Sequence, residues 1–231
     1  MFNSCIRPIL TYTSDIWGIN KLGRDKIDKI FLKFLKNLLG VKQSTSSLMV
    51  LGETGQFLPS SDCISNVSKY LNRVRNMNDG CITKQVYNEL VLLDSCGFDT
   101  WYSRASDLVH KYSLESNPNL QKYKLQAKNT IQNDFIRDWY GNIQKHIKNP
   151  ICRTYSLFKF QFKMEPYLIY IQDRKLRRSL TLLRTSSHAL GIETSRHRQN
   201  NNQKESNRLC STCNTLDDEI HFLLHCSRFS E

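Results

Sequence analysis

The feature that most constrains this chain is a cluster of cysteine and histidine residues close to its C-terminus. Cys210, Cys213, His221 and Cys226 follow the spacing C-x2-C-x7-H-x4-C. Two thiolates from a tight turn can meet an imidazole and a third thiolate from a short helix at one tetrahedral Zn²⁺. Four protein ligands leave no position open for water, so the spacing predicts a structural zinc site and not a hydrolytic one.

Cysteines that only pack in an apolar core are the alternative, because Cys is among the most buried residue types. The clustering favours the metal: three of the eight Cys and two of the six His lie within 210–226, and the other five Cys are scattered. His225 competes with Cys226 for the fourth ligand position. We favour Cys226, because a thiolate bonds zinc more strongly.

The charge of the chain predicts a polyanionic partner. Its 231 residues carry a net charge of +12, and residues 122–208 hold eighteen Lys or Arg against six Asp or Glu. The remainder of the chain is balanced, so the excess lies directly before the cysteine cluster. Such a segment favours nucleic acid first and an anionic membrane surface second. The 39% hydrophobic content is enough for a core and excludes a disordered tail.

The remaining cysteines predict an intracellular protein. Cys5, Cys63, Cys81, Cys96 and Cys152 are odd in number and irregular in spacing, which fits reduced thiols better than disulfides. The first twenty residues lack the pattern of a signal peptide, and no apolar run approaches the ~20 residues of a membrane span. Nucleus and cytoplasm are not distinguished. The abrupt ends predict a fragment of a larger protein.

Hydrophobic periodicity predicts a mainly α fold. Apolar residues recur at helical spacing in five stretches: 24–39, 64–77, 82–93, 101–114 and 125–147. A further short helix is expected within 1–18, limited by Pro8. Gly40 should end the first long helix, and Ser61 or Asp62 should cap the next. Residues 41–59 are expected to form loops around a short apolar stretch.

Residues 154–164 alternate in part between aromatic and basic side chains. Phe158, Phe160 and Phe162 would lie on one side of a short β element, with Lys159 and Lys163 on the other. Three aromatics interleaved with cations also describe a platform for stacking bases. The simpler interpretation, which we weight more heavily, places Phe against a core and Lys in water.

Residues 174–184 predict a basic helix. Leu176, Leu180 and Leu183 anchor one face. Its cations are Arg174, Lys175, Arg177 and Arg178 in the first turn, and Arg184 at the end. The first turn is where cations are least favoured by the helix macrodipole, which suggests an external anion. We therefore predict that these residues, with Lys159 and Lys163, contact nucleic acid; a solvated helix face is the alternative.

Several segments, in their order along the chain, resemble one family. They include Cys5–Tyr12 with Ile16-Trp17-Gly18, Val50–Gly55, Glu165–Leu168, Arg184–His188 and Arg208-x-Cys210-x2-Cys213 with Glu219-x-His221-Phe222-Leu223-x2-Cys226. Together they are similar to the C-terminal part of reverse transcriptases from non-LTR (LINE-type) retrotransposons, downstream of the polymerase palm. Ser195 before Arg196 departs from the family pattern, which usually has Gly there.

The resemblance implies three regions: a thumb-like helical region at 1–121, a basic connector at 122–208 and a zinc-knuckle-like CCHC module at 209–231. It implies RNA or DNA as partner, and a polymerase domain upstream of Met1 that holds the catalytic carboxylates. The single Asp-Asp pair, Asp217-Asp218, lies inside the zinc loop, so no catalytic site is expected here. The alternatives are a zinc-stabilised protein-interaction module and a decayed or domesticated open reading frame.

Overall fold

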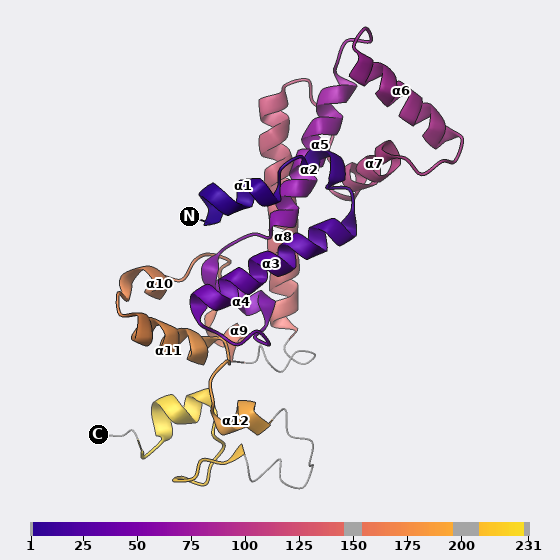
Figure 1. Cartoon of the computed structure of the whole chain (residues 1–231). Coiled ribbons are helices and arrows are strands. Elements are labelled where there is room, and N and C mark those ends of the chain that lie inside the picture. The colour runs from indigo at the N-terminus through magenta and orange to yellow at the C-terminus, as the bar shows by residue number, and fades with distance from the viewer. Residues whose placement is uncertain (1, 146–153, 196–207, 229–231) are drawn as a thin grey trace. The chain divides into compact units, whose positions relative to one another are not determined.

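The computed structural model describes residues 2–145, 154–195 and 208–228, and this part of the chain is mainly helical (Figure 1). The mainly α prediction is therefore confirmed. The elements up to residue 75 are η1 (Phe2–Ile6), α1 (Arg7–Leu10), α2 (Ser14–Trp17), α3 (Lys21–Leu39), α4 (Ser47–Thr54) and α5 (Pro59–Arg75). The later elements are α6 (Ile82–Ser95), α7 (Trp101–Lys111), α8 (Leu120–Gln144), α9 (Tyr155–Phe158), α10 (Tyr167–Tyr170), α11 (Arg174–Arg184), α12 (Gly191–Thr194) and η6 (His221–His225).

The long helices lie where the apolar periodicity placed them. In α3 the buried stripe is Ile27, Phe31, Leu35 and Leu39, with spacings of four residues. The helix ends before Gly40, which has a φ of +69°, a left-handed conformation that favours glycine. Side chains spaced by about one helical turn share a face, so the pattern alone was sufficient here.

Two predictions for residues 41–62 are wrong. The apolar stretch at 48–51 is part of α4, in which Met49 to Thr54 are all buried. Helix α5 begins at Pro59 after Leu58, which makes no side-chain cap, and Asp62 instead pairs with Arg7 at 2.5 Å between Oδ2 and Nε. A short apolar run does not distinguish a buried helix from a loop, and Pro at the first helical position needs no N–H partner.

The predicted β element at 154–164 is not formed as a strand. Residues Tyr155–Phe158 make the single helical turn α9, and Met164 makes one isolated antiparallel bridge with Thr54. The rings of Tyr155 and Phe158 pack edge to face, with centroids 5.4 Å apart. Tyr155 is fully buried, and its hydroxyl donates to the Met49 carbonyl at 3.2 Å. Packing of this tyrosine against α4 outweighs the weak alternation.

The chain divides into two compact units. Unit 1 contains 1–32 and 57–139, and unit 2 contains 33–56 and 140–231. Each unit joins segments that are distant in sequence. The predicted division at 121 and 208 stays a prediction.

Unit 1 has an apolar core. Helix α5 packs against α2, α6 and α7 (Figure 1). The buried side chains of the core are Val67, Leu71, Ala105, Val109, Leu114, Tyr123 and Ala127. Thr100 caps α7 in a reciprocal box with Ser103, which satisfies N–H groups at the start of that helix. None of the helices in the described residues has the length and apolar character needed to cross a bilayer.

Unit 2 is built around a buried carboxylate, Glu53 of α4. Glu53 is 0% exposed, and the guanidinium of Arg184 at the end of α11 donates two hydrogen bonds to its carboxylate. Nε lies 2.9 Å from one carboxylate oxygen, and the second nitrogen lies 3.0 Å from the other. Tyr167 of α10 donates its hydroxyl to Glu53 at 2.7 Å. This carboxylate therefore joins α4, α10 and α11.

A second carboxylate completes the network. Arg184 also contacts Glu165 at 2.8 Å, and Glu165 pairs with the buried ammonium of Lys159. The Arg184 guanidinium lies over the ring of Phe158, 4.4 Å from its centroid. Burial alone lowers the pKa of Arg184, but the hydrogen bonds and charge of Glu53 outweigh it and raise the pKa. All of these charges are paired, as burial requires.

We expect Glu53→Gln to destabilise unit 2 selectively. A buried bidentate pair that loses one charge costs about 3 kcal/mol, at the low end of the usual range because Arg184 keeps Glu165. Hydrogen exchange should show lost protection in α4 and α11 and unchanged protection in α5 and α7. Glu89→Gln, at an exposed position in α6, is the matched control and should change stability by less than about 0.5 kcal/mol. Equal protection in both variants would contradict the role given to Glu53.

Candidate metal centre

The first two cysteines lie in a tight loop closed by a single β bridge. Leu209 and Leu216 form the antiparallel bridge, and the Cys210 N–H donates to the Thr215 carbonyl at 2.7 Å. Asn214 adopts a φ of +52°, a conformation that asparagine tolerates better than most residues. The chain therefore reverses directly after Cys213. This reversal brings both thiols to one side of the loop.

The other two candidate ligands flank the helical turn η6. The carboxylate of Asp218 accepts the His221 N–H at 2.8 Å, which caps the start of the turn. The Cys226 N–H donates to the His221 carbonyl at 2.8 Å and ends it. One short turn thus sets both His221 and Cys226. Both carboxylates of the Asp217-Asp218 pair accept backbone N–H groups, since Asp217 accepts the Gly191 N–H at 2.6 Å.

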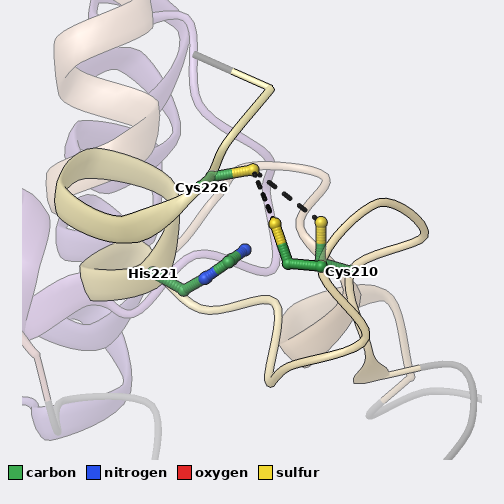
Figure 2. Close-up of side chains that lie close together, drawn as sticks. Cys210, His221 and Cys226 are labelled. Carbon is green, nitrogen blue, oxygen red and sulfur yellow. Dashed lines mark hydrogen bonds between the residues drawn. The ribbon is translucent and has the colours of Figure 1, made fainter. Parts of the chain in front are cut away.

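The four side chains converge. The Sγ atom of Cys226 lies 3.8 Å from that of Cys210 and 3.9 Å from that of Cys213. One ligand atom from each of the four residues lies within 4.8 Å of the others. Figure 2 shows the His221 ring directed toward the sulfur atoms. The group Cys210, Cys213, His221 and Cys226 is therefore able to hold a metal ion.

The two nitrogen atoms of the His221 ring have different surroundings. Its Nδ1 atom lies 3.1 Å from the hydroxyl of Thr215. Its Nε2 atom is buried and has no hydrogen-bond partner. A buried polar atom without a partner is costly, and a metal ion on Nε2 removes that cost. Thr215 fixes the ring in the way that outer-shell groups orient metal-bound histidines.

The thiols differ in acidity. N–H groups of Cys213 and Thr212, followed by the His221 side chain, lower the pKa of Cys210 to about 6. Burial, followed by the neighbouring Cys210 and Cys213, raises the pKa of Cys226. A metal ion bound here would favour the deprotonated form of the three cysteines, because the thiolate is the form that binds metal.

Glu219 connects the metal group to the rest of unit 2. It is 3% exposed and contacts His188 at 3.0 Å, Ser186 at 3.1 Å and Thr154 at 3.1 Å. Burial raises the pKa of Glu219, but the hydrogen bond from His188 and the Glu219 N–H outweigh it, and the pKa falls to about 2. An ionised carboxylate therefore anchors the loop that carries His221.

The structure separates the predicted nucleic-acid contacts into two groups. Arg174, Lys175, Arg178 and Lys163 are exposed, and Arg177 is half-buried. The other two predicted contacts, Lys159 and Arg184, point into the network of Glu165 and Glu53 described above. Their charges are used inside the protein. The exposed group is the part available to an external anion, and its binding role stays a prediction.

Helix α11 has an anion of its own at its N-terminus, and the aromatic residues before it differ in exposure. Asp173 caps α11 and accepts the N–H groups of Lys175 at 2.6 Å and Leu176 at 3.1 Å, so an anion already stands at the helix N-terminus. The helix macrodipole therefore gives no reason to expect an external anion. The prediction of nucleic-acid binding rests on the exposed cations. Phe158 packs beneath Arg184 while Phe160 is 71% exposed, so these aromatics do not share one face.

Sequence reasoning missed Glu53 and Glu219. Residues 41–59 were expected to form loops, yet the short apolar stretch at 48–51, followed after Gly52 by the charged Glu53, was a signal of a buried carboxylate with a partner. His225 is exposed, so the prediction of Cys226 over His225 agrees with the geometry.

No protein-family model matches the chain, and neither curated proteins nor solved structures give a significant match.

We expect purified protein to contain about one equivalent of bound metal ion. Cys213→Ser should remove it, because a hydroxyl is a poor substitute for a thiolate. Cys96→Ser, at an exposed site in unit 1, and His225→Ala should both keep the metal. Elemental analysis after gel filtration measures all three. Full metal in Cys213→Ser, or its loss in His225→Ala, would contradict the ligand set.

Proposed function

We propose that the metal of this chain is a structural Zn²⁺. Zinc prefers tetrahedral sites with thiolate and imidazole ligands, and Zn–S bonds of about 2.3 Å place neighbouring sulfur atoms about 3.8 Å apart. The 3.8 and 3.9 Å separations from Cys226 are the observation that supports this assignment most directly. With three cysteines and one histidine the shell is complete, so the ion has no open position for chemistry.

The segment around the ligands needs such an ion to fold. Its apolar side chains are largely exposed: Leu209 by 39%, Leu216 by 41%, Ile220 by 47%, Leu223 by 61% and Leu224 by 72%. So little apolar burial cannot offset the conformational entropy of ordering the loop. Metal binding free energy becomes folding free energy in modules of this kind.

We further propose that the chain binds RNA or DNA through the exposed cations of α11. Arg174 and Lys175 have no ion-pair partner among the described residues, and Arg177 and Arg178 are held by backbone carbonyls, which leave their charge uncompensated. Guanidinium groups fit phosphate geometry well. The excess charge of the surrounding segment supports the same partner.

The ordered motifs given above favour an origin in a non-LTR retrotransposon reverse transcriptase. On this proposal the chain is the region downstream of the palm, and it helps to hold template RNA or target DNA for an upstream polymerase domain. It contributes binding and no catalytic carboxylates. An acidic protein surface is the competing partner for the same cations, and a polyanion that is not a nucleic acid separates the two.

We expect the quadruple variant Arg174→Gln, Lys175→Gln, Arg177→Gln, Arg178→Gln to bind nucleic acid with a flatter salt dependence. Each phosphate contact contributes about 0.7 to 0.9 to the slope of log K against log salt, so the slope should fall by roughly three units. Affinity should fall about equally for different sequences, because phosphate contacts carry no sequence information. Fluorescence anisotropy across a salt series measures both.

The matched control removes four exposed charges from α3: Lys21→Gln, Lys26→Gln, Lys29→Gln and Lys33→Gln. It should keep most of the slope although its net charge change is the same. Heparin serves as the polyanion that is not a nucleic acid. Equal slopes in the two quadruple variants would overturn the assignment to α11, and stronger binding to heparin than to RNA or DNA would favour the acidic-partner alternative.

We also expect no nucleotide incorporation by this chain with Mg²⁺ or Mn²⁺. Polymerase chemistry requires paired carboxylates that hold two metal ions, and the Asp217-Asp218 pair is engaged in the zinc loop. Primer extension on a simple RNA template is the measurement, with an active reverse transcriptase in the same buffer as positive control. Extension that co-purifies with the chain would contradict the proposal.

A further inference from the structure

Unit 2 contains a pocket that the proposed phosphate contacts do not account for. It has a volume of about 360 Å³ and lies between the end of α3, α10 and α11. Three of its lining residues are leucines, Leu38, Leu39 and Leu168, which we call the leucine wall, and four are the cations of the first turns of α11, which we call the cationic rim. A pure phosphate site has no use for three leucines. The volume is at the lower end of the about 300 to 1,000 Å³ of small-molecule sites.

The rim is pre-organised by neutral acceptors. Arg178 donates from Nε to the Gly40 carbonyl at 3.0 Å, and Arg177 donates to the Ile171 carbonyl at 3.2 Å. Both guanidinium groups are therefore fixed while their charge is not neutralised. The residues that line the pocket include no carboxylate. The nearby Asp173 has one oxygen occupied by two N–H groups of α11.

Gly40 contributes to this arrangement in two ways. Its φ of +69° allows the chain to turn at the end of α3. A Cβ at this position would lie 2.9 Å from the Cδ and Nε atoms of Arg178. The absence of a side chain at Gly40 thus lets the Arg178 guanidinium lie close to the backbone, and both residues line the pocket. The turn and the close approach both require glycine here.

We propose that this pocket holds one unpaired nucleotide of a single-stranded nucleic acid. The base of this nucleotide lies against the leucine wall and the planar arginines, and the phosphates on either side of the nucleotide contact the cationic rim. A base within a duplex is stacked on both faces and its rings do not reach such a pocket, whereas an unpaired base does. A free anion lacks a group for the leucines, and a lipid tail does not match the charged rim.

This inference rests on the proposed function, because it names what the nucleic-acid site of α11 selects. It adds a contact with the base to the contacts with phosphate. The two contacts can be tested separately, because a strand of abasic sites keeps every phosphate and has no bases. Leu38 is 63% exposed, so its replacement by Gln changes the pocket wall with little effect on the fold.

The experiment compares three probes of equal length across a salt series: a single strand, its abasic counterpart and a duplex. The unmodified protein should bind the single strand most tightly. Leu38→Gln should weaken binding of that strand on the order of fivefold, because an apolar contact with the base is lost. The affinity for the abasic strand should not change. Its salt slope should stay the same. Leu22→Gln, on an exposed part of the same helix, is the matched control and should change nothing.

Leu168→Ala gives an independent test of the same wall, with circular dichroism to verify folding. Equal affinity of the unmodified protein for the single strand and the abasic strand would overturn the pocket proposal while the phosphate contacts remain. Unchanged single-strand affinity in both leucine variants would also overturn it. Absence of binding to all three probes, even at the lowest salt concentration, would instead overturn the proposed function itself.

Discussion

The buried pair between Glu53 and Arg184 is the interaction on which unit 2 depends. A carboxylate with no exposed surface is costly unless a fixed cation and further donors compensate it, and here Arg184 and Tyr167 both do so. These contacts fix the C-terminal end of α11 against α4. The first turns of α11 then meet the end of α3, where Arg178 reaches Gly40. Both the exposed cations and the leucine-lined pocket follow from that placement.

The same helix leads directly into the support of the metal centre. Thr185 follows Arg184 and is buried, and the next residues bring Ser186 and His188 to Glu219. Glu219 precedes His221 by two residues, so an ionised carboxylate lies between the helical part of unit 2 and the loop of the candidate metal ligands. The candidate metal ligands thus lie in a small module with little apolar core, which polar contacts connect to a larger scaffold.

Most of the local structure was predictable and most of the polar network was not. The helices α3, α5, α6, α7, α8 and α11 lie where apolar periodicity indicated, because that pattern is set by the geometry of the helix itself. Helix α4 was missed because its apolar run is too short to show a period. The prediction of a β element at 154–164 was wrong because the buried Tyr155 packs on α4 instead. Lys159 was expected in solvent, yet Glu165 makes its burial possible.

The sequence by itself determined the mainly helical fold and the four candidate ligands, because helical periodicity and the C-x2-C-x7-H-x4-C spacing are both local properties of the chain. It also located the excess positive charge. Only the tertiary structure decided that Arg184 is paired inside the protein, since its partner Glu53 comes from α4, 131 residues away. It also decided that Lys159 is buried against Glu165 and not exposed to solvent. The pocket likewise required α3 and α11, about 140 residues apart, to meet at Gly40 and Arg178. Contacts between distant segments are fixed by packing and charge pairing in three dimensions, which no short stretch of sequence encodes.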